Sequence, residues 1–183
     1  MKKRVLVPLA KGFEEIEAVV VIDVLRRADV DVVVAGLEPG PIEGAHGITI
    51  QTDAELGDVV DEAFDMLVLP GGIPGTTHLA EDERVLGIVK RMHGEQLTTA
   101  AICAAPTVLH TAGILAGVSV TSHPAVRAQL EQAEVCDEPR VVRSGSVVTS
   151  QGVGTALEFA LELVLELSGG AKASELAKAM VVR

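Results

Sequence analysis

The residues that could do chemistry begin with Cys103, which lies between an apolar stretch and a proline. Residues 98–102 are small, apolar or β-branched and predict a buried strand, whereas Pro106 suits the first turn of a helix. A cysteine at that junction lies at a helix N-terminus, where backbone N–H groups and the helix dipole favour the thiolate. The alternative is a small buried hydrophobic residue, as most free cysteines are. The stretch alone leaves both interpretations open.

Glu17 is the second candidate, near the start of a predicted helix. It shares a helical face with Val21 and Val24, so an acid lies on an apolar stripe. Burial there would raise its pKa and keep it partly protonated, able to donate a hydrogen bond to a thiolate. The alternative is an acid that serves the helix dipole, but Glu14 and Glu15 already fill that role. We therefore predict a functional Glu17.

Three further positions could support a reactive cysteine. Gly71 and Gly72 follow a buried strand, and their backbone N–H groups could bind an anion, although an ordinary turn would look the same. His123 follows a short predicted strand and could carry protons near a thiol, and the alternative is a surface histidine. Cys136 lies among acidic residues that disfavour a thiolate, so we expect it to be unreactive.

Cofactor motifs are missing from the sequence. Residues 152–155 (GVGT) precede the C-terminal helix and suit either an anion-binding turn or a tight cap, but no Gly-Lys-Ser/Thr follows as a phosphate loop requires. No His, Cys, Asp or Glu cluster has metal-ligand spacing. We therefore expect neither a metal nor a cofactor.

The elements that must position these residues alternate between strands and helices. Predicted strands are residues 4–9, 30–35, 66–69, 98–102 and 118–121, an edge strand at 48–51, and a hairpin of 140–143 with 147–149. Predicted helices are residues 14–27, 80–93, 106–112, 124–133, 155–167 and 174–179. This alternation predicts an α/β fold, a mostly parallel sheet with helices on both faces. Because ligands bind beyond the carboxyl ends of such strands, the loops 11–15, 70–75 and 103–106 should form the site.

Composition limits the possible functions. The 183 residues suit a single domain over 1–183, and the net charge of −11 argues against nucleic acid or an anionic membrane surface as a partner. No apolar run is long enough to span a bilayer. Two cysteines give no disulfide framework, so the expected location is cytoplasmic.

Six stretches, in order, carry a family resemblance. They are residues 9–17 (LAKGFEEIE), 22–27 (IDVLRR), 68–72 (VLPGG), 100–107 (AAICAAPT), 121–124 (TSHP) and 149–155 (TSQGVGT). Together they resemble the ThiJ/PfpI superfamily, specifically the branch of the human parkinsonism-associated protein deglycase and its bacterial relatives. The resemblance implies a flavodoxin-like sandwich and a homodimer. Ala104 stands where peptidase-like members carry a histidine, so a protease is disfavoured.

The resemblance also implies roles for individual residues. Cys103 matches the reactive, easily oxidised cysteine, Glu17 the acid that hydrogen-bonds it, and His123 the nearby histidine. Gly72 and Ala104 match residues whose backbone N–H groups form an anion pocket beside that cysteine.

Two functions follow from these residues as alternatives. The first is a cofactor-free glyoxalase or deglycase, in which Cys103 attacks methylglyoxal, glyoxal or a glycated side chain. The second is a redox sensor or redox-activated chaperone that responds to oxidation of Cys103 to a sulfinic acid. A purely structural interaction module is a third alternative, which leaves an acid on an apolar face unexplained. Sequence alone does not separate the first two, because both need the same cysteine.

Overall fold

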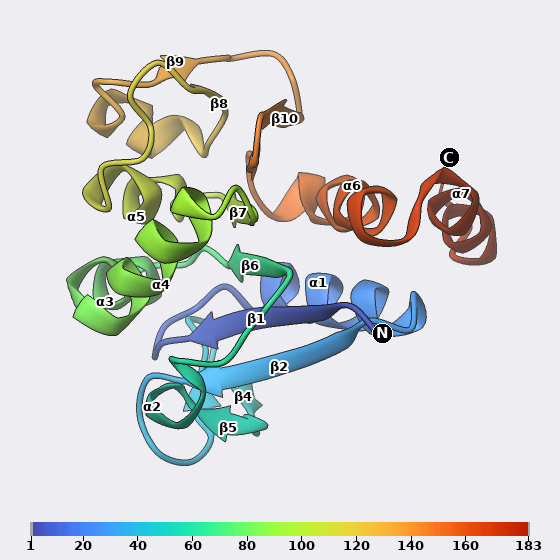
Figure 1. Ribbon diagram of the computed structural model, residues 1–183, viewed down its shortest axis with the longest axis horizontal. Helices are drawn as coiled ribbons and strands as arrows, with labels where there is room; N and C mark the ends of the chain where they lie inside the picture. The colour runs from blue at the N-terminus through green and yellow to red at the C-terminus, as the bar shows by residue number, and fades with distance from the viewer. Residues whose placement is uncertain (1, 183) are drawn as a thin grey trace.

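The computed structural model describes residues 2–182 and has a seven-stranded sheet at its centre (Figure 1). The strand order is β10-β11-β7-β6-β1-β2-β5. Every neighbouring pair is parallel except β10 with β11, which form the predicted antiparallel hairpin. The strands are β1 (Arg4–Leu9), β2 (Asp31–Gly36), β5 (Ala54–Glu55), β6 (Met66–Leu69), β7 (Thr98–Ile102), β10 (Val141–Ser144) and β11 (Val147–Ser150). The predicted mostly parallel α/β sheet is therefore confirmed.

Helices cover both faces of the sheet, because its strand residues alternate between two apolar clusters. One cluster joins Val5 and Val7 to the helices α1, α6 and α7. The other joins Leu6 and Leu67 to α2, α3, α4 and α5. The helices are α1 (Glu15–Arg27), α2 (Leu56–Val59), α3 (Gly75–Glu81), α4 (Glu83–Gly94), α5 (Pro106–Thr111), α6 (Ala156–Ser168) and α7 (Gly170–Ala179).

Several predicted elements differ from the structure. The helix predicted over 80–93 is two helices, because the Asp82 backbone is extended and its carboxylate caps α4 by accepting from the N–H of Arg84. Residues 124–133 form only a 3-10 helix over Pro124–Gln129. A longer α-helix does not form there because Leu130 leaves the helical conformation.

Two predicted strands lie outside the main sheet. The strand predicted at 48–51 is β4 (Thr49–Ile50), which pairs with β3 (Ile42–Glu43) in a separate hairpin. The strand predicted at 118–121 is β8 (Ser119–Val120), which pairs with β9 (Glu134–Val135). Both pairings are only two residues long, so each strand is shorter than predicted and lies outside the main sheet.

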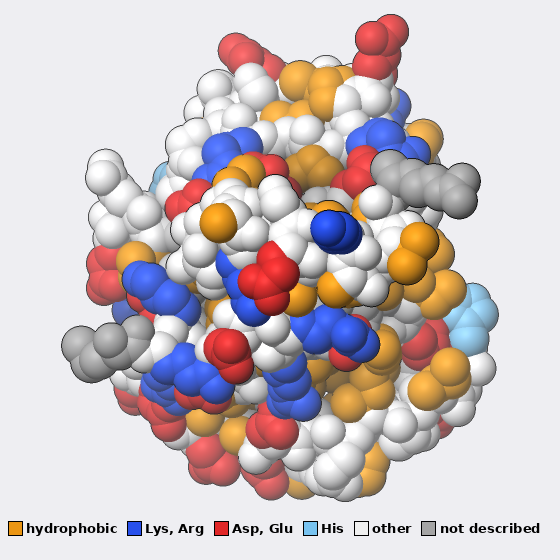
Figure 2. Space-filling view, turned by 90° about the vertical axis from the view of Figure 1, so that its right-hand side faces the viewer, with side chains coloured by type: hydrophobic (Ala, Val, Ile, Leu, Met, Phe, Trp, Pro, Cys, Tyr) orange, Lys and Arg blue, Asp and Glu red, His pale blue; other side chains and the backbone are white. Residues whose placement is uncertain are grey.

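The surface mixes charges of both signs. In Figure 2, Lys and Arg side chains lie beside Asp and Glu side chains. Arg4, for example, pairs with Asp31 and Glu62, and Arg143 pairs with Glu162. The face in view therefore has no purely basic surface of the kind that binds phosphate backbones. Within residues 2–182, no helix has both the length and the apolar character needed to cross a bilayer.

Candidate active site

Cys103 lies at a sharp turn between β7 and α5, at the carboxyl edge of the sheet. Its φ of 63° is in the left-handed region, which a residue with a side chain occupies at a cost of about 1–2 kcal/mol. The turn is held on both sides, because the Cys103 N–H donates to Ser150 (3.0 Å) and its carbonyl accepts from His123 (2.8 Å). The fold therefore maintains a strained backbone that directs the sulfur out of the strand.

Glu17 lies near the start of α1, close to this sulfur. The residue is fully buried, and its Oε2 accepts a hydrogen bond from the Gly71 N–H at 2.9 Å. Its Oε1 is buried without a protein partner. Gly71 separates the carboxylate from the cysteine so closely that a Cβ at this position would lie 2.5 Å from Cys103 Cβ and 2.6 Å from Glu17 Oε2. The predicted buried acid therefore lies beside the predicted reactive cysteine.

Cys103 and Glu17 titrate as a coupled pair. Burial raises the pKa of Glu17 to about 7, against the opposing hydrogen bonds from Cys103 and Gly71. Burial, followed by the charge and hydrogen bond of Glu17, raises the pKa of Cys103 to about 12. The pair therefore gives up its first proton near pH 7 and keeps the second, which lies between carboxylate and sulfur.

This arrangement corrects one expectation. We expected the helix N-terminus to favour a free thiolate at Cys103, but α5 has only six residues and the buried sulfur faces a carboxyl group. Two backbone N–H groups, those of Gly72 and Ala104, do act in the predicted direction and lower the pKa of the thiol. The third predicted donor, Gly71, instead directs its N–H to Glu17. Deprotonation of Cys103 thus depends on Glu17 as a proton acceptor.

His123 borders the same space as Cys103 and Glu17. A Cβ built on Gly152 would lie 3.7 Å from His123 Cδ2, 3.8 Å from Glu17 Oε1 and 3.9 Å from Cys103 Sγ. The imidazole is exposed, and its Nδ1 accepts from the Ala125 N–H at 3.3 Å. The structure therefore brings the three predicted side chains together around one glycine, with His123 on the solvent side.

A cavity of about 520 Å³ opens over these residues. It is also lined by three polar side chains that were not predicted as site residues, Glu14, Arg140 and Gln151, although Glu14 belongs to the predicted site loop 11–15. The Arg140 guanidinium is fixed by Glu158, to which its Nε donates at 2.8 and 2.9 Å. Arg140 reaches the cavity from the loop before β10, and no sequence motif marks it. The cavity is large enough for a small carbonyl compound and polar enough to orient one.

Comparison with known proteins adds to this geometry. A model described as the DJ-1/PfpI family matches residues 3–166. The chain belongs to the DJ-1/PfpI family. The protein dj-1beta of Drosophila melanogaster is 41% identical over 184 residues, covering 100% of this chain and 98% of that protein. The glutathione-independent glyoxalase DJR-1.2 of Caenorhabditis elegans is 40% identical over 167 residues, covering 90% of this chain and 88% of that protein.

Solved structures of DJ-1/PfpI proteins have the same fold. The crystal structure of Drosophila melanogaster DJ-1beta superposes with a TM-score of 0.98 at 40% identity, covering 100% of both chains. An oxidized Toxoplasma gondii DJ-1 superposes with a TM-score of 0.92 at 35% identity, covering 98% of both chains. The flavodoxin-like sandwich implied by the resemblance is therefore confirmed.

Proposed function

We propose that this protein converts methylglyoxal, glyoxal or early glycation adducts to 2-hydroxy acids, with Cys103 as nucleophile and no cofactor. The observation that carries the proposal is the contact between Cys103 and the buried Glu17, whose raised pKa of about 7 lets it gain and lose a proton at neutral pH. The glyoxalase among the relatives supports the same class of chemistry. Methylglyoxal and glycated side chains are thus the proposed partners.

The first step forms a hemithioacetal. The sulfur of Cys103 attacks the aldehyde carbon of methylglyoxal while Glu17 takes the thiol proton. The π electron pair of the C=O bond moves to the oxygen, which then receives that proton from Glu17 and becomes the hydroxyl of the hemithioacetal. The N–H groups of Gly72 and Ala104 face the sulfur and stabilise negative charge on it as the thiol proton leaves. Glu17 is suited to the proton transfer because its free Oε1 lies buried on the cavity side.

The second step isomerises the adduct. A base removes the proton from the former aldehyde carbon to give an enediol, and return of a proton to the neighbouring carbon leaves a lactoyl thioester on Cys103. Water then attacks the thioester, which releases lactate and restores the thiol. Glu17 is the proposed base, and His123, exposed at the cavity wall, exchanges protons with solvent.

Turnover in D2O tests this route. The enediol takes its new proton from the solvent or from a group that exchanges with it, so lactate formed in D2O should carry deuterium at C2, detected by proton NMR. Lactate without any deuterium at C2 would mean that the hydrogen passes between the two carbons without exchange, and would contradict a base that equilibrates with solvent through His123. A Cys136→Ser variant, altered at a half-buried cysteine outside the cavity lining, serves as the control and should match the wild type.

A redox-sensing role, alone or coupled to chaperone activity, is a second candidate. The N–H groups of Gly72 and Ala104 and a protonated Glu17 surround the sulfur with donors that could bind sulfinate oxygens. Mild peroxide should then add two oxygen atoms to the wild-type chain and none to Cys103→Ser, as measured by intact mass. Equal oxidation of both proteins would place the reaction at Cys136 or at one of the four methionines and reject this role.

We also infer a homodimer and a cytoplasmic location. Ile16 and Val19 on α1 and Ile48 on the neighbouring hairpin are 51%, 46% and 58% exposed, which leaves apolar side chains for a second copy to cover. Sedimentation equilibrium should give the mass of two chains for the wild type and of one chain for Val19→Asp. Both cysteines are free thiols, as is usual in a reducing compartment.

A further inference from the structure

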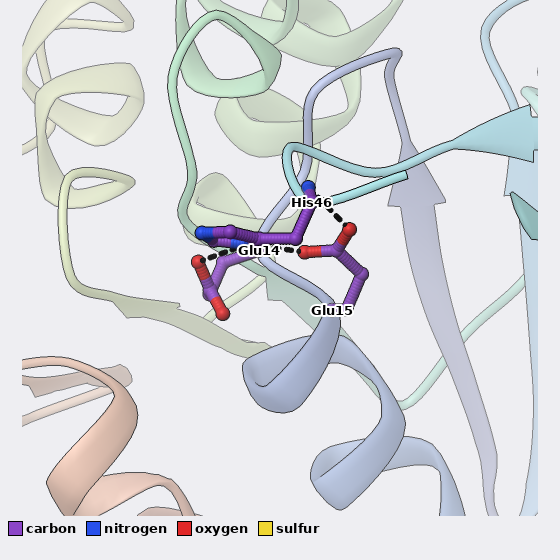
Figure 3. A group of neighbouring side chains, drawn as sticks. All are labelled: Glu14, Glu15 and His46. Atoms are coloured by element: carbon purple, nitrogen blue, oxygen red, sulfur yellow. Dashed lines mark hydrogen bonds and ion pairs between the residues drawn. The ribbon is translucent and has the colours of Figure 1, made fainter. Parts of the chain in front are cut away.

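Glu14, Glu15 and His46 form a second cluster of ionisable side chains at the start of α1 (Figure 3). The His46 side chain reaches from the turn of the β3–β4 hairpin to the two carboxylates. Its Nδ1 lies 2.9 Å from Glu15 Oε2 and 3.6 Å from Glu14 Oε2. One potential ligand atom from each residue lies within 4.8 Å of the others. No local pattern in the sequence predicts this cluster, because His46 is 31 residues from Glu15.

The donor set suits a borderline divalent cation. One imidazole nitrogen and two carboxylate oxygens are ligands that Zn²⁺ accepts in protein sites with an open coordination position. Glu15 is already fixed, because its Oε1 accepts from the backbone N–H of His46 at 2.6 Å and of Ile48 at 3.4 Å. Its side chain is only 4% exposed, whereas that of His46 is 69% exposed. An ion would therefore meet one immobilised ligand and one ligand that is exposed in the single chain.

The charges around the cluster also favour a cation. Glu14, Glu15 and Glu17 lie within one turn of the chain. Across residues 2–182, the ion pairs of Glu14 and Glu15 are with His46, and no Lys or Arg pairs with any of these three acids. Negative charge from Glu14 and Glu15 is thus concentrated at one place.

We propose that Glu14, Glu15 and His46 bind a divalent transition-metal cation, with Zn²⁺ as the probe, beside the Cys103 cavity. Three protein ligands leave coordination positions for water or for a ligand in the cavity. Glu14 connects the two sites, because it also lines the cavity and its charge acts on Glu17. A cation bound here would offset negative charge next to the catalytic acid without touching Cys103. This site is independent of the proposed glyoxalase activity, and binding is its direct readout.

The test must separate this cluster from Cys103, Glu17 and His123, which could bind Zn²⁺ themselves. Isothermal titration with Zn²⁺ alone is therefore done on Cys103→Ser, in neutral buffer without chelators. We expect one Zn²⁺ per chain. When His46→Ala or Glu14→Gln is combined with Cys103→Ser, the affinity for Zn²⁺ should fall at least about tenfold. Glu15 is left unchanged, because its carboxylate also holds the hairpin. His110→Ala, at another histidine outside both groups, is the matched control and should bind as Cys103→Ser does.

Co²⁺ gives a second, spectroscopic readout, which does not depend on the heat of binding. Co²⁺ bound by this cluster should show visible d–d bands without thiolate-to-cobalt charge transfer, and His46→Ala should lose those bands. The proposal is overturned if Cys103→Ser binds no Zn²⁺, or if His46→Ala leaves the affinity and the cobalt spectrum unchanged. It is equally overturned if His110→Ala weakens binding as much as His46→Ala does. None of these results depends on whether methylglyoxal is a substrate.

Discussion

Cys103→Ser should lower the conversion of methylglyoxal to lactate by at least about a thousandfold. Serine keeps the size and the hydrogen-bonding direction of the side chain, but its hydroxyl is a much weaker nucleophile than a thiol. No other group that lines the cavity can replace the sulfur, since the remaining side chains are acids, a histidine, an arginine, an amide and small residues. The measurement is steady-state lactate formation by wild type and variant at equal concentration.

A control must show that Cys103→Ser still folds. The Cys103 backbone is held by hydrogen bonds to Ser150 and His123 that do not involve its side chain, so the far-ultraviolet circular dichroism and the unfolding midpoint should change little. Cys136→Ser should retain full turnover. If Cys103→Ser turns over methylglyoxal at the wild-type rate, the thiol is not the nucleophile. If wild type forms no lactate but gains two oxygen atoms at Cys103 in peroxide, sensing replaces catalysis as the function.

The sequence was most informative where the structure depends on the residues of one element alone. Strands β6 and β7 were predicted to the residue, because each is a short apolar run bounded by charged or turn residues. Glu17 was predicted because an acid on an apolar helical stripe is a local pattern. Cys103 was predicted because the strand, the small residues and Pro106 are consecutive in the chain.

What the sequence did not predict depends on contacts between distant segments. Arg140 enters the cavity only because Glu158, on α6, holds its guanidinium. The pKa of Cys103 rises first because the fold buries its sulfur, and then because β7 brings that sulfur to the carboxyl group of Glu17 on α1. The breaks at Asp82 and Leu130 reflect local backbone preferences that an apolar periodicity does not reveal. For Arg140 and Cys103, proximity in space, rather than residue type, was the missing information.

Glu17→Gln should make the protein more stable above pH 7 and much less active. The pKa of Glu17 is about 7 in the folded chain and 4.5 without the fold, so the folded state binds the proton more tightly. The stability from this group is therefore fully present below pH 4.5 and is lost as the pH rises through 7. The loss amounts to about 3 kcal/mol of unfolding free energy, because each pKa unit corresponds to about 1.4 kcal/mol. Glutamine cannot ionise and should not show this loss.

Urea unfolding at several pH values measures the effect, followed by circular dichroism because the chain has no Trp or Tyr. Other groups, such as Asp65 and Asp82 with their lowered pKa values, change stability in the opposite direction. Their contributions cancel when the variant is subtracted from the wild type at each pH. The difference should be small near pH 4.5 and grow to about 3 kcal/mol above pH 7. A difference independent of pH would mean that folding leaves the pKa of Glu17 unchanged, and would contradict the raised pKa on which its proton transfer at neutral pH depends. Turnover should fall about 10² to 10⁴-fold in the same variant, because the more stable protein has lost its base.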